Sequence, residues 1–142
     1  MKIQISENID KAIEGYIVIP ILYGEVDLSR IPNNCASNII AIDAVDSIKR
    51  ENIEKFIQDV CSKMRLGSVL NIGGLDIYAV SRDFLGGKID LDEYNKLMAN
   101  KRGIHSNSQI TQLLSKYAIS IQSVVFKGYY YEIAATRPQN IN

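Results

Sequence analysis

Hydrophobic and polar positions alternate along this chain with two periods, and each period predicts one kind of element. Short apolar or alternating runs, several of them rich in β-branched residues, predict strands. They cover residues 2–5, 16–21, 39–42, 68–72, 120–126 and 129–136. Apolar residues with helical spacing predict helices in three places, over 53–64, 76–85 and 92–99. A fourth helix is predicted after Ser106, which forms a capping box with Gln109.

Strands that alternate with helices are typical of an α/β fold. The run Ile39–Ile42 is continuously apolar, which indicates a strand covered on both faces in a parallel sheet. The last two strands are separated by Lys127-Gly128, a link too short for anything but an antiparallel hairpin. We therefore predict a mostly parallel sheet with a C-terminal antiparallel hairpin and helices on both faces.

The ends of these elements carry their own signals. Asp46 or Ser47 is predicted to cap the helix over 53–64, and Gly67 suits a left-handed stop at its end. Gly73-Gly74 is predicted to end the strand over 68–72, and Asp76 is predicted to cap the next helix.

Length and composition narrow the class of protein. A chain of 142 residues, 46% of them hydrophobic, is enough for one domain with its own core. Lys plus Arg equals Asp plus Glu at 16 each, so general nucleic-acid binding is not expected. Two cysteines and one histidine make a disulfide scaffold or a Cys/His metal site improbable, and we expect no metal. With no leader-like or membrane-spanning apolar run, a cytoplasmic location and no membrane association are predicted.

Several local phrases, in order, resemble the small class I S-adenosylmethionine (SAM)-dependent methyltransferases. They are Glu14–Pro20 for the second strand, Val26–Pro32 for the following loop, Asn34–Ile48 for the fourth strand and its exit, Lys63–Leu70 for a helix-to-strand turn, and Tyr130–Pro138 for the last strand. The resemblance spans nearly the whole chain. It implies a single methyltransferase-like domain over 1–142 with a Rossmann-like sheet and a lid-like helical insertion at about 76–105.

The resemblance also shows what is missing. Such proteins hold SAM with glycines after the first strand, which let the backbone approach the cofactor, and with an acid at the end of the second strand. Here the first position reads Ser6-Glu7-Asn8 and the second is Pro20. We therefore expect no cofactor. The alternative is that SAM binds through a variant loop.

The candidate site residues lie where strands end. The resemblance implies cofactor contacts at Ser6, Asn8, Asp27, Ile42 and Asp43, and a catalytic role at Asp43. The lone histidine, His105, is a candidate general base on its own chemistry. Two of these residues also have a structural alternative. Asp27 suits a turn before Ser29, and His105 suits a loop residue before a helix.

Three functions are compatible with this sequence. The first is a methyltransferase-like domain with a degenerate SAM site, kept as a non-catalytic structural or interaction module. It would associate with itself or with a protein partner, for instance along the C-terminal hairpin. The second is an active SAM-dependent methyltransferase that acts on a small molecule or sugar. The third is a small-ligand binder that reuses the same crevice.

Overall fold

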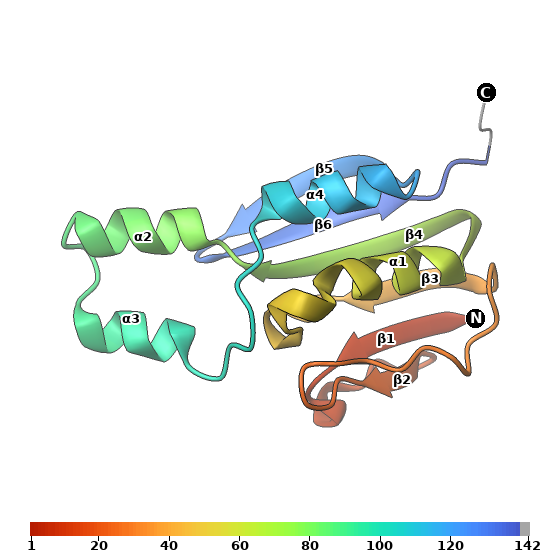
Figure 1. The fold of residues 1–142 in the computed structure, drawn as a ribbon, viewed down its shortest axis with the longest axis horizontal. Coiled ribbons are helices and arrows are strands. Elements are labelled where there is room, and N and C mark those ends of the chain that lie inside the picture. Colours follow the sequence, from red (N-terminus) through yellow and green to blue (C-terminus); the bar gives the residue numbers. More distant parts are fainter. Residues whose placement is uncertain (140–142) are drawn as a thin grey trace.

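The computed structural model describes residues 1–139, and its centre is a six-stranded sheet with the strand order β2-β1-β3-β4-β6-β5 (Figure 1). The strands are β1 (Lys2–Ser6), β2 (Ile17–Pro20), β3 (Ala36–Ala41), β4 (Met64–Leu75), β5 (Ser120–Lys127) and β6 (Tyr130–Thr136). Strands β1 to β4 are parallel, whereas β6 is antiparallel to both β4 and β5. The predicted mixed sheet with a C-terminal antiparallel hairpin is confirmed.

The helices are α1 (Ile53–Lys63), α2 (Ile77–Leu85), α3 (Leu91–Met98) and α4 (Asn107–Lys116), with single 3-10 turns η1 (Ile9–Lys11), η2 (Val45–Ser47) and η3 (Arg50–Asn52). Helices α1 and α4 lie side by side on one face of the sheet, while α2 and α3 project beyond its end (Figure 1). The projecting pair occupies the position of the predicted lid-like insertion.

The main core lies between the sheet and helices α1 and α4. Alternate strand residues such as Ile39, Leu70 and Ile133 point to this face and are buried. They meet the apolar stripe of α1, including Phe56 and Val60, whose helical spacing the sequence displays. A smaller cluster around Leu75, Val80 and Ile89 holds α2 and α3 to the end of the sheet.

Helices cover the two faces unequally, and the strand order explains why. Strand β5 also runs parallel to β1–β4, because β6 is antiparallel to both of its neighbours, so the parallel strands have four connections. Three of these connections, from β2 to β3, from β3 to β4 and from β4 to β5, step across the sheet in the same direction. Right-handed crossovers therefore place these three connections on the same face. Only the connection from β1 to β2 steps the other way, and among residues 1–139 it carries a single helical turn, η1. On that face Val69 and Ile42 keep 36% and 40% of their surface exposed.

Three of the predicted element ends are wrong and two are confirmed. Asp76 and Ser106 cap α2 and α4, as predicted. Asp46 caps no α-helix, because α1 begins seven residues later without a side-chain cap. Gly73 and Gly74 lie inside β4 rather than after it.

The two glycines in β4 serve packing and not a turn. A Cβ atom on Gly73 would come within 2.4 Å of the Tyr131 carbonyl oxygen, and one on Gly74 within 2.3 Å of the Val45 side chain. Gly67 has a φ of +78° but also lies within β4, after α1 has already ended at Lys63.

Candidate functional site

The order of the strands places a crevice at the point where the chain reverses its direction across the sheet. From β1 the chain moves outward to β2, and from β3 it moves the other way to β4. Open α/β sheets bind ligands outside the carboxyl ends of the strands at such a switch point. A cavity of about 350 Å³ lies there, which is within the usual range for a small-molecule site.

Three segments form the walls of this crevice. They are the turn after β1 at 6–8, the exit of β3 at 42–47, and residues 99–101, where the chain returns from α3. Four of the predicted cofactor residues, Ser6, Asn8, Ile42 and Asp43, lie together in it. Asp43 is exposed and has a left-handed φ of 61°, which the sharp exit from β3 requires.

The turn after β1 is held by its own side chains. The Ser6 hydroxyl accepts a hydrogen bond from the Asn8 backbone N–H at 3.1 Å, and Asn8 Oδ1 accepts one from the Asp10 N–H at 3.0 Å. The Ser47 hydroxyl donates to Glu7 Oε2 at 2.5 Å. The last bond joins the first wall of the crevice to the second.

Asp46, next to Ser47, joins the second wall to the third. Its carboxylate is buried and accepts the backbone N–H of Leu75 at 3.0 and 3.1 Å and the ammonium of Lys101 at 3.2 Å. Its backbone carbonyl accepts the N–H of Arg102 at 2.8 Å. Because Leu75 precedes α2 and Lys101 follows α3, this one residue holds both ends of the α2–α3 segment.

The environment changes the pKa values of this pair. Burial raises the pKa of Asp46, and the hydrogen bond from Leu75 and the charge of Lys101 offset only part of that effect. Burial opposes the charge of Lys101, but Asp46 and then Tyr130 raise the pKa of the ammonium above its ordinary value. The Lys101 nitrogen also lies 5.2 Å from the centre of the Tyr130 ring, in a cation–π contact.

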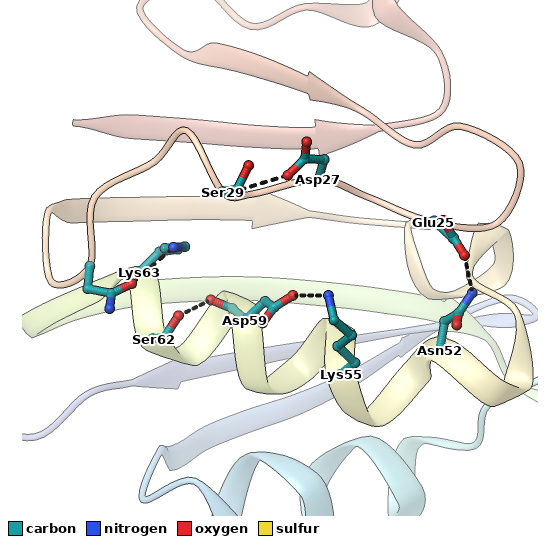
Figure 2. Close-up of polar contacts among 9 residues, drawn as sticks. Glu25, Asp27, Ser29, Asn52, Lys55, Asp59, Ser62 and Lys63 are labelled. Carbon is teal, nitrogen blue, oxygen red and sulfur yellow. Dashed lines mark hydrogen bonds and ion pairs between the residues drawn. The ribbon is translucent and has the colours of Figure 1, made fainter.

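Asp27 lies apart from the crevice. It lines a separate, broad hollow of about 760 Å³ beside Pro20 and the edge strand β2. Its carboxylate accepts the Ser29 backbone N–H at 2.9 Å, and hydrogen bonding from Ser29 lowers its pKa. Figure 2 shows Asp27 bonded to Ser29 on the loop that runs beside α1, and this bond is the turn role that the sequence left open.

Further polar contacts tie the same loop to η3, the turn that directly precedes α1. The Asn52 side-chain amide donates to the Gly24 carbonyl at 3.3 Å and reaches Glu25 Oε1 at 3.5 Å, as Figure 2 shows for Glu25. These contacts anchor the loop between β2 and β3 to the first turns of the α1 region, away from the crevice.

His105 lies in the core and not in the crevice. Its side chain is fully buried, and Nε2 lies 2.8 Å from the Ile48 carbonyl oxygen. A carbonyl only accepts, so Nε2 carries the hydrogen and Nδ1 is a buried acceptor without a partner in the described part of the chain. The Tyr131 hydroxyl donates to the His105 carbonyl at 2.6 Å.

Two further features of residues 1–139 bear on chemistry. No group of three or more His, Cys, Asp or Glu side chains is arranged to hold a metal ion within this range. None of its helices is long and apolar enough to cross a membrane.

Comparison with solved structures defines the class of fold. No protein-family model and no curated protein sequence matches the chain. An O-methyltransferase family protein from Burkholderia thailandensis superposes with a TM-score of 0.62 at 12% identity, over 88% of this chain and 36% of that one. A SAM-dependent methyltransferase from Archaeoglobus fulgidus gives 0.62 at 13% identity, over 93% and 74% of the two chains. The magnesium protoporphyrin IX methyltransferase of Synechocystis PCC 6803, solved with bound S-adenosylhomocysteine (SAH), gives 0.57 at 16% identity, over 86% and 50%.

The chain is therefore a Rossmann-like α/β protein with a mixed sheet. More particularly, its fold is that of the class I SAM-dependent methyltransferases, as the sequence resemblance predicts. It spans 36% and 64% of the length of the first two structures it matches, the second being a methyltransferase from Thermotoga maritima.

Proposed function

We propose that this chain is a methyltransferase-fold domain that does not catalyse methyl transfer and acts as a structural or interaction module. The observation that carries the proposal is the turn after β1. A glycine turn leaves room for a cofactor and leaves its backbone free to approach it. Here Ser6, Glu7 and Asn8 fill the turn, and Glu7 is bonded across the crevice to Ser47.

Charge and geometry support the same conclusion. A carboxylate at Glu7 in this turn would face the carboxylate of the SAM methionyl group and repel it. The second implied anchor, an acid at the end of β2, is replaced by Pro20, which lines a different hollow. Two of the contacts that the resemblance implies for SAM thus have no counterpart, so the residues present do not fit the cofactor in that manner.

Calorimetric titration of the folded protein with SAM and with SAH tests the proposal. We expect no saturable heat with either ligand. The matched variant Glu7→Gly removes the hydrogen bond to Ser47 and the local negative charge. If this variant alone binds SAM or SAH, the turn after β1 is the cause of the missing cofactor binding. Saturable binding to the wild-type protein in the micromolar range or tighter would overturn the proposal.

A second candidate is an active SAM-dependent methyltransferase that uses a variant loop and acts on a small molecule or sugar. The observation that favours it is the crevice itself, which keeps a volume of about 350 Å³ at the switch point and an exposed carboxylate at Asp43. This candidate requires SAM binding that Asp43→Asn weakens. Transfer of a radiolabelled methyl group to a small-molecule acceptor would establish it.

A further inference from the structure

The two edges of the sheet differ in how well they are protected. Exposed edge strands offer free backbone N–H and C=O groups for pairing with another chain, and proteins shorten them or place proline in them. The β2 edge is four residues long and ends at Pro20, which has no N–H. The β5 edge at the other side is eight residues long and contains no proline, and no described element lies beyond it (Figure 1).

The side chains of β5 are unusual for a solvent-facing edge. Its sequence SIQSVVFK carries one charge, Lys127, which is paired with Glu132 on β6 at 3.3 Å. Val125 and Phe126 expose 46% and 54% of their surface. A bulge at Gln122 interrupts the strand, so its regular part is Ser123–Lys127, paired one to one with β6.

We propose that β5 pairs antiparallel with β5 of a second copy of this chain, so that the two sheets continue into one. A pair of identical strands related by a two-fold axis is an isologous contact, in which the same surface serves both copies. The proposal concerns a different surface from the crevice and holds whatever the crevice binds.

The alternation of side chains restricts the register. Residues directly opposite each other in an antiparallel pair must point to the same face of the sheet. In a pair of identical strands this requires that the residue at the two-fold axis lies opposite its own copy and not opposite its sequence neighbour. Centring it on Val125 puts Val125 opposite its own copy and Phe126 opposite Val124. Aromatic and β-branched residues stabilise a sheet when they are cross-strand neighbours.

The same register also keeps like charges apart. Lys127 falls opposite Ser123 and never opposite the other Lys127, so no like charges meet across the pair. A strand from an unrelated partner would have no reason to share this self-complementarity. We therefore assign the edge to a second copy.

Sedimentation equilibrium tests the pairing. It is measured for the wild-type protein and for two single variants, Val125→Asp and Leu85→Asp. Wild type should show a monomer–dimer equilibrium. Val125→Asp places two carboxylates face to face and should weaken the dimer by at least about tenfold. Leu85, 84% exposed at the end of α2, is the matched control, and Leu85→Asp should leave the equilibrium unchanged. A wild-type protein that is monomeric at all concentrations, or equal weakening by both variants, would refute the proposal.

Cysteine cross-linking tests the register independently of stability. In a Cys35→Ser background, Val125→Cys puts two thiols at the distance a disulfide needs, whereas Ser123→Cys puts each thiol opposite Lys127. Oxidation should give a covalent dimer with Val125→Cys and little with Ser123→Cys. Equal yields from both, or none from Val125→Cys, would contradict the proposed register.

Discussion

Replacement of Asp46 should separate its two roles, as a hydrogen-bond acceptor for the backbone and as the partner of a half-buried ammonium. Asp46→Ala removes both. It leaves the Leu75 N–H without its acceptor and Lys101 without its countercharge. Asp46→Asn keeps a side-chain carbonyl that can still accept from Leu75 and loses only the charge.

The structure sets the expected magnitudes. An orphaned buried donor costs about 1–3 kcal/mol, and breaking a buried ion pair costs about 3–5 kcal/mol. The Lys101 side chain is 17% exposed and can turn toward water, so the loss of its countercharge costs less than that range, about 1 kcal/mol. We expect Asp46→Ala to lower the free energy of unfolding by about 3 kcal/mol and Asp46→Asn by about 1 kcal/mol.

Urea unfolding followed by circular dichroism at neutral pH measures both values, provided that the denaturant slope is unchanged. Hydrogen exchange adds a local test. Because Asp46 holds both ends of the α2–α3 segment, amides of residues 76–105 should lose protection in Asp46→Ala more than amides of β1. Losses below about 0.5 kcal/mol for both variants would refute this account, as would equal losses for the two.

Three further predictions follow from single contacts. Burial raises the pKa of Asp46 above its ordinary value of 3.8, so the folded state keeps this proton where the unfolded state has lost it. The stability of wild type minus that of Asp46→Asn should then fall as pH rises from about 4 through the folded pKa, and a difference that is flat with pH would contradict this. Ser106→Ala removes the side-chain cap that accepts the Gln109 N–H at 3.1 Å and should cost about 1 kcal/mol in thermal or urea unfolding, whereas Ser106→Asp should restore it. Burial raises the pKa of the Cys61 thiol to about 12, so a thiol reagent at pH 8 should label Cys35 first and Cys61 only on unfolding; equal rates for the two would refute this.

Most of the elements could be predicted because their signals are local. The stripe of α1 and the short link between β5 and β6 act within a few residues, and both elements form where predicted. Gly73 and Gly74 were misleading for a physical reason. Their missing side chains make room for Tyr131 and Val45, and contacts between distant residues leave no trace in local periodicity.

The residues of the candidate site also divide into those whose position the sequence could predict and those whose contacts it could not. Ser6, Asn8 and Asp43 could be placed together because β1 and β3 are neighbours whose carboxyl ends share one edge. The pairing of Asp46 with Lys101 spans 55 residues and depends on how the α2–α3 segment returns to the sheet. The only local sign of it was an acid just after a buried strand, a position equally suited to a helix cap.

The two ties at the crevice involve consecutive residues, Asp46 and Ser47, on the exit of β3. Ser47 holds the turn after β1 through Glu7, and Asp46 holds the α2–α3 segment through Leu75 and Lys101. A ligand that pushes the turn outward must therefore strain the same short segment that fixes the third wall. In a binding site such rigidity restricts what can enter, whereas in a non-catalytic module it keeps the sheet and its edges in a fixed geometry.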